Sequence, residues 1–137
     1  MRQFLVIASL SVLACGTTGN QSLVFSEPAS QELTSTSGML TVKVYQLASQ
    51  PMGRGVNALK LMVASTDGGT PITGLTLGMT AWMPAMGHGS AVTPTVETID
   101  GGFVVSEISM AMAGSWECRC AFSGPMDDSA TLTFDIQ

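Results

Sequence analysis

Apolar and polar residues alternate along most of the chain from residue 39 onward. In the segment 39–47, Leu40, Val42 and Val44 fall on one side and Lys43 on the other. A period of two is typical of a β-strand with one buried face. This alternation, or a run rich in β-branched and aromatic residues, marks seven segments: 39–47, 56–65, 73–82, 93–98, 102–109, 115–122 and 129–136.

Turn-forming residues separate these segments. Asp-Gly-Gly occurs at 67–69 and again at 100–102, and Ser-Gly-Pro occurs at 123–125. Such clusters end strands because they favour tight changes of chain direction. Short strands with a turn about every ten residues predict an all-β fold, an immunoglobulin-like antiparallel β-sandwich of about seven strands.

The N-terminal part of the chain has a different pattern. Arg2 precedes an apolar run from Phe4 to Ala14, which is too short to cross a bilayer comfortably, and Cys15 follows. The ending Val-Leu-Ala-Cys resembles the bacterial lipoprotein signal, which implies cleavage before Cys15 and a lipid on its thiol. A signal peptide cut elsewhere is the alternative. We therefore expect a signal peptide at 1–14, a lipidated cysteine with a flexible tether at 15–37, and a folded domain at 38–137.

These N-terminal features predict a location. A lipid anchor holds a protein at the membrane surface without crossing the bilayer. We expect the protein on the periplasmic side of a bacterial cell envelope. Gly16 stands after the cysteine in place of the aspartate associated with retention at the inner membrane, which favours the outer membrane.

The charge of the chain argues against one class of partner. The net charge is −5, and only four basic residues remain without the signal: Lys43, Arg54, Lys60 and Arg119. They are scattered, whereas nucleic acid binding needs clustered cations, so nucleic acid is not an expected partner. The sequence also lacks the motifs of common hydrolases and phosphate-binding enzymes, and we expect no catalysis.

Methionine and histidine gather in the connections at one end of the predicted sandwich. Alternate connections of a seven-stranded sandwich meet at the same end, which brings together the segments around residues 52, 86 and 111. These connections hold five of the ten methionines and the chain's only histidine. The five methionines are Met52, Met83, Met86, Met110 and Met112.

Neutral thioether sulfur favours Cu(I) over harder cations, and an imidazole nitrogen raises the affinity. Pro84 and the glycines at 87 and 89 allow the loop to turn back around an ion. The candidate ligands are Met83, Met86 and His88 in one loop, with Met110 and Met112 in the facing loop. The alternative is ordinary packing, since methionine readily fills gaps in a core, and the segment with Met86 and His88 could equally be a plain surface loop.

Cys118 and Cys120 lie on one strand face with Trp116 and Phe122. These aromatic neighbours favour buried, unreactive thiols. A soft-metal pair, a redox pair and a disulfide are the alternatives.

Two segments carry a family resemblance, "MPAMGHGS" (83–90) and "MAMAGSWECRCAF" (110–122). They resemble the YtkA-like domain family and the similar FixH-like proteins over about residues 38–137. The resemblance implies an exported or membrane-tethered immunoglobulin-like sandwich, with copper handling or cytochrome oxidase assembly in some relatives. The candidate ligands at the motif positions of the family are Met83, Met86, His88, Met110 and Met112. Cys118 and Cys120 depart from it, because aliphatic core residues are expected there.

These observations predict a lipid-anchored, extracytoplasmic protein that captures or delivers Cu(I). Its expected partners are the membrane, through the lipid, and a copper-receiving protein or oxidase assembly factor. The alternative function is an envelope interaction module that binds no metal and uses its methionine-rich end as an adaptable apolar contact. Thiol redox chemistry through the cysteine pair is the third hypothesis.

Overall fold

The computed structural model describes residues 22–137, so the expected signal peptide and Cys15 lie outside the described residues. The elements in chain order are β1 (Gln31–Thr34), β2 (Leu40–Gln46), β3 (Gly55–Ser65), β4 (Thr76–Met83), the short 3-10 helix η1 (Pro84–Met86), β5 (His88–Gly89), β6 (Thr95–Ile99), β7 (Gly102–Met110), β8 (Gly114–Ser123) and β9 (Asp128–Ile136). All seven predicted strands are present, as β2, β3, β4, β6, β7, β8 and β9. Within residues 22–137, no helix is both long and apolar enough to cross a membrane.

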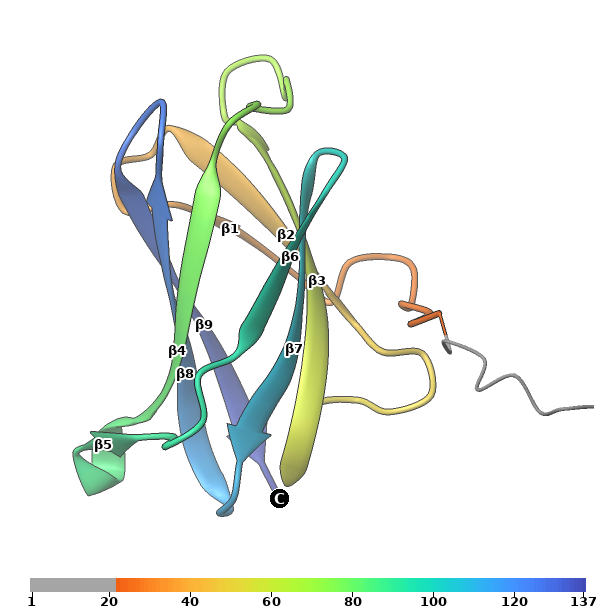
Figure 1. Cartoon of the computed structure of the whole chain (residues 1–137), viewed down its shortest axis with the longest axis vertical. Helices are drawn as coiled ribbons and strands as arrows, with labels where there is room; N and C mark the ends of the chain where they lie inside the picture. Colours follow the sequence, from red (N-terminus) through yellow and green to blue (C-terminus); the bar gives the residue numbers. More distant parts are fainter. Residues whose placement is uncertain (1–21) are drawn as a thin grey trace, which may run out of the picture.

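The strands form two antiparallel sheets that pack face to face. One sheet has the order β1-β2-β3-β7-β6 and the other β5-β4-β8-β9. Figure 1 shows the two layers, with η1, β5, the β7–β8 turn and the C-terminus all near the lower end of the view. The predicted all-β, immunoglobulin-like sandwich is confirmed.

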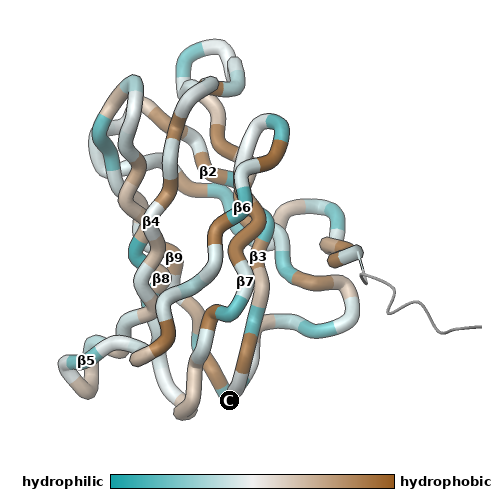
Figure 2. The backbone as a smooth tube through the Cα atoms, viewed as in Figure 1, coloured by the Kyte–Doolittle hydropathy of each residue, from teal (hydrophilic) through white to brown (hydrophobic). Residues whose placement is uncertain are grey.

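The core lies between the inner faces of the two sheets, where the alternating apolar residues meet. Along β8, Trp116, Cys118, Cys120 and Phe122 are buried while the residues between them face outward. Figure 2 shows hydrophobic positions interspersed with hydrophilic ones along the strands. Burial of one large apolar side chain stabilises a fold by about 1.5–3 kcal/mol. The inward-facing residues of the period-two pattern are therefore the main source of the stability of this domain.

The folded domain begins earlier than the sequence predicted. Gln31–Thr34, expected within a flexible tether, form the edge strand β1 and pair with β2. Thr36 then donates its backbone N–H to the Ser129 carbonyl at 2.8 Å, and the Gln31 side chain donates to the Thr133 carbonyl at 3.1 Å. The segment therefore covers the edge of β9. Its one inward apolar residue, Leu33, gave too short a pattern for the alternation to reveal the strand.

A β-bulge in β7 changes which residues of that strand face the core. The register with β3 shifts between Asn57 and Leu59, and Glu107, opposite this shift, adopts a φ of 57°. An extra residue reverses the alternation beyond the bulge. Ile108 and Met110 therefore point into the core, and Ser109 does not.

Glycines 102 and 78 allow a direct test of the sheet packing. A Cβ on Gly102 would collide with the backbone carbonyl of Leu61, whereas a Cβ on Gly78 would meet nothing within 4 Å. We expect Gly102→Ala to lower the free energy of unfolding by about 1–3 kcal/mol, as overpacking does. Gly78→Ala should raise it by about 0.5–1 kcal/mol, because alanine is less flexible in the unfolded chain. Urea denaturation of both variants tests this, and equal stability of the two would contradict the observed packing.

Candidate metal centre

The connection after β4 folds back on itself to form one end of the sandwich. Pro84 starts η1, and Gly87 ends it in a left-handed conformation with a φ of 68°. Glycine adopts this conformation without steric cost. The Gly87 N–H donates to the Met83 carbonyl at 3.1 Å, so the chain reverses and His88 becomes the register partner of Met83.

The returning chain lies close against β4. A Cβ on Gly89 would lie 2.9 Å from the Ala81 carbonyl oxygen and 3.2 Å from the Trp82 ring, so only glycine permits this approach. Ser90 then donates its N–H to the Ala81 carbonyl at 2.9 Å. Gly87 and Gly89, which the sequence identified as turn residues, therefore hold His88 in a defined position.

Met83 and His88 project on the same side of the sheet. Directly opposed residues of an antiparallel pair share a face, with Cβ atoms about 4.5–5.5 Å apart. Met83 is buried at the end of the core, while His88 lies beyond the core and is exposed. The register thus places the two residues opposite each other, although Met83 does not line the hollow that His88 lines.

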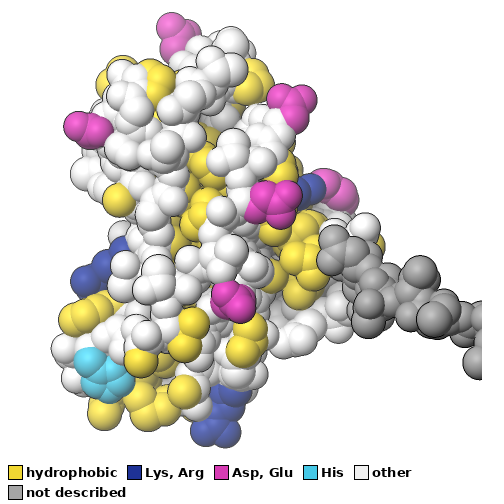
Figure 3. All heavy atoms as spheres, viewed as in Figure 1, with side chains coloured by type: hydrophobic (Ala, Val, Ile, Leu, Met, Phe, Trp, Pro, Cys, Tyr) yellow, Lys and Arg dark blue, Asp and Glu magenta, His cyan; other side chains and the backbone are white. Residues whose placement is uncertain are grey.

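His88 and Met112 line the same hollow, which has a volume of about 400 Å³. Its wall is formed by one segment of the β4–β6 connection and one from the β7–β8 region: His88, Gly89, Ser90, Ala91 and Val92, with Ser109, Ala111, Met112 and Trp116. Figure 3 shows hydrophobic side chains gathered around the histidine at this end of the molecule. Two of the three connections that were predicted to meet, the one between β4 and β6 and the one between β7 and β8, therefore do line one hollow. Trp116 was not among the candidate site residues of the sequence analysis.

The other candidate ligands, Met83, Met86 and Met110, do not line this hollow. Met86, on η1, is 55% exposed, and Met83 and Met110 belong to the hydrophobic core. For Met110, which is completely buried, packing is the interpretation that the structure supports. Met52, from the third connection, is half-buried against the core and does not line the hollow. Figure 1 shows this connection looping out beside β3.

The His88 ring is oriented by its own backbone. Nδ1 lies 3.2 Å from the Gly89 carbonyl oxygen. A carbonyl can only accept, so this hydrogen bond requires Nδ1 to carry the proton. Nε2 then keeps a free lone pair. Metal-binding histidines commonly have this arrangement, with the second ring nitrogen donating to a backbone carbonyl.

Cys118 and Cys120 are buried in the core and unpaired with each other. Burial raises the pKa of the Cys118 thiol to about 12, and the neighbouring Cys120 adds to the rise. Burial alone raises the pKa of Cys120 to about 12. The redox hypothesis required accessible thiols, and the structure shows inaccessible ones.

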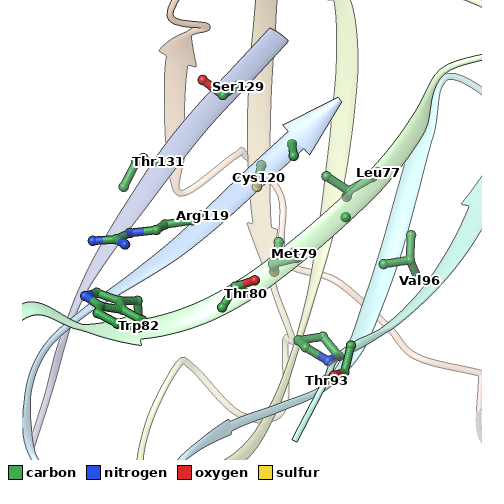
Figure 4. Close-up of a pocket in the computed structure, with 13 residues that line it drawn as sticks. Leu77, Met79, Thr80, Trp82, Thr93, Val96, Arg119, Cys120, Ser129 and Thr131 are labelled. Atoms are coloured by element: carbon green, nitrogen blue, oxygen red, sulfur yellow. The ribbon is translucent and has the colours of Figure 1, made fainter. Parts of the chain in front are cut away.

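A larger hollow, of about 910 Å³, lies along β4 between its outer edge and β6. Figure 4 shows Trp82 and Arg119 close together on one side of it and Val96 on the other. The Arg119 guanidinium stacks 4.8 Å from the Trp82 ring and forms an ion pair with Glu117 at 2.8 Å. None of the predicted metal ligands lines this hollow. Residues 22–137 also contain no cluster of three or more His, Cys, Asp or Glu side chains suited to a metal ion.

Comparisons with known proteins agree with the fold. Residues 34–121 match the model of the YtkA-like family. The structure is similar to a copper-bound variant of FetP from uropathogenic Escherichia coli strain F11, with a TM-score of 0.54 and 14% sequence identity. The similarity covers 79% of this chain and 95% of the FetP chain. No curated protein matches the sequence.

The raised thiol pKa values predict slow chemistry at Cys118 and Cys120. At pH 8, a thiol of pKa 12 is ionised in about one molecule in ten thousand, and the thiolate is the reactive form. In a Cys15→Ser chain, we expect no labelling by iodoacetamide within the time that free cysteine reacts fully. Two labels per chain should appear in denaturant. Rapid labelling of the native protein, measured by mass spectrometry, would show that the thiols are accessible.

Proposed function

Because the chain belongs to the YtkA-like family, we propose that it is a lipid-anchored protein of the bacterial cell envelope that binds Cu(I) for capture or delivery. The observation that carries this proposal is the meeting of His88 and Met112, 24 positions apart in the sequence, in one hollow. The fold shared with a copper-bound protein supports it.

The donor set fits a soft monovalent ion. His88 offers Nε2, and Met112 offers a neutral thioether from the facing turn. Met83, the register partner of His88, and the exposed Met86 are the sulfur donors nearest to His88 along the chain. Thioether and neutral imidazole donors suit Cu(I), and neither has to become an anion to bind it.

The position of the site suits transfer of the ion. His88 and Met86 are exposed, so the ion would be bound at one end of the domain and within reach of a second protein. Neutral donors dissociate more readily than thiolates, which favours exchange with a copper-receiving protein or an oxidase assembly factor. A lipid at Cys15 would hold the domain at the membrane surface, with the residues before Val24 as the connection, because Val24 and Ser26 already hydrogen-bond to Ala48 and Gln46.

An interaction module without metal is the second candidate function. Met86 and Val92, exposed at 55% and 47%, both lie on the β4–β6 connection, and apolar side chains exposed on one segment are candidates for a protein contact surface. Methionine is well suited to such a surface because its side chain is flexible. Copper binding distinguishes the two functions, since the interaction module needs no metal ligand.

Competition with a chromophoric chelator tests the copper site. We expect the chain with Cys15→Ser to bind one Cu(I), and His88→Ala with Met112→Leu to weaken binding at least about a hundredfold, or about 2.7 kcal/mol. Met39→Leu is the matched control, because Met39 is also 55% exposed but lies on the other side of the fold, beside Thr66. Its affinity should equal that of the parent chain.

Two outcomes of this titration would contradict the proposal. One is the absence of competition even against a weak chelator. The other is full Cu(I) binding by the double variant, which would assign the ion to other donors such as Cys118 and Cys120.

The lipid anchor has a separate test. Expressed with its own N-terminus in a bacterium, the chain should fractionate with membranes, whereas Cys15→Ser should appear in the soluble envelope fraction. Mass spectrometry of the membrane form should show acyl groups on a chain that begins at Cys15. An unmodified Cys15 in a soluble protein would contradict the anchor and leave the copper site untouched.

A further inference from the structure

Trp116 belongs to the hydrophobic core and to the wall of the hollow at the same time. It lies in β8 opposite Phe134 and is 2% exposed. It is nevertheless one of the residues that line the hollow with His88 and Met112. A buried side chain therefore forms part of the wall of the candidate metal centre.

The polar atom of Trp116 is directed at the residue that would bind the ion. Its Nε1–H donates to the Met112 carbonyl oxygen at 2.9 Å. Within residues 22–137, this is the only side-chain hydrogen bond that reaches the turn formed by residues 111–113. The bond connects the turn to the core, because Trp116 is fixed by its neighbours in both sheets.

We propose that Trp116 is a positioning residue of the copper site, which holds the β7–β8 turn so that the Met112 thioether faces His88. This proposal rests on the proposed function. Outer partners that orient a metal ligand typically change metal affinity by about 10–100-fold when removed. Without the indole N–H, Met112 loses its fixed backbone position, and the site loses its second donor before an ion arrives.

The same strand, β8, provides a matched control for the loss of core packing. Phe122 lies near the other end of β8, is 2% exposed like Trp116, and is absent from the wall of the hollow that holds His88. Trp82, the only other tryptophan, is unsuitable as a control, because its ring packs against Gly89 beside His88.

The test compares Trp116→Phe with Phe122→Leu, both in the Cys15→Ser chain, using Ag(I) as a redox-stable probe for Cu(I). Phenylalanine keeps an aromatic ring in the core and removes only the N–H and the second ring. We expect Trp116→Phe to bind Ag(I) at least about tenfold more weakly than the parent, and Phe122→Leu to bind within about twofold of it. Urea denaturation, recorded separately, gives the stability of each variant.

A second measurement needs no change at Trp116. The ¹H–¹⁵N spectrum of the parent contains two indole N–H signals, which Trp82→Phe assigns. Addition of Ag(I) should shift the Trp116 signal, which would place the ion beside this residue. The affinity of Trp116→Phe then decides whether the N–H positions Met112 or the ring serves packing alone.

The outcomes separate this inference from the proposed function. If the parent binds Ag(I) but the Trp116 signal stays in place, or a folded Trp116→Phe binds with full affinity, the positioning role is wrong and the copper site stands. If the parent binds neither Ag(I) nor Cu(I), both proposals fail.

Discussion

The packing of two apolar sheet faces against each other is the constraint on which this structure depends. Each strand contributes every second residue to the shared interior, and the alternation fixes which side chains are left for the surface. At one end the interior is completed by methionine and tryptophan, with Met83, Met110 and Trp116 all buried. The candidate metal centre is built directly on this end of the core, so its geometry follows from the same packing that stabilises the domain.

The seven main strands could be predicted because burial of one face leaves a period-two pattern in the sequence. Three features could not be predicted in this way. Strand β1 has one inward apolar residue, Leu33, and β5 has only two residues, so neither has a pattern long enough to recognise. The bulge at Glu107 depends on pairing with β3, which no local signal specifies. The bulge explains why Val105 and Ile108 are both buried although they lie three positions apart, where a regular strand buries every second residue.

The sequence predicted that methionine and histidine gather at one end of the sandwich. It did not predict which of these side chains face one another. The topology of a sandwich brings the β4–β6 connection and the β7–β8 turn to one end, and the structure places His88 and Met112 there together. The direction of each side chain depends on register, which the sequence does not reveal. The bulge turns Met110 into the core, and the reversal at Gly87 sets His88 opposite Met83. The hydrogen bond from Trp116 to Met112 joins residues four apart across a turn, and it becomes apparent only in three dimensions.

The central claim is that His88 and Met112 bind one soft ion between them, and a crystal structure of the protein loaded with Ag(I) tests it most directly. Silver scatters anomalously, so a single peak locates the ion without assumptions about its ligands. We expect a peak within bonding distance of both the His88 Nε2 atom and the Met112 sulfur, with the β7–β8 turn in the conformation described above. A peak at Cys118 and Cys120 would contradict this claim. So would a silver ion that is bonded to only one of His88 and Met112, or to neither.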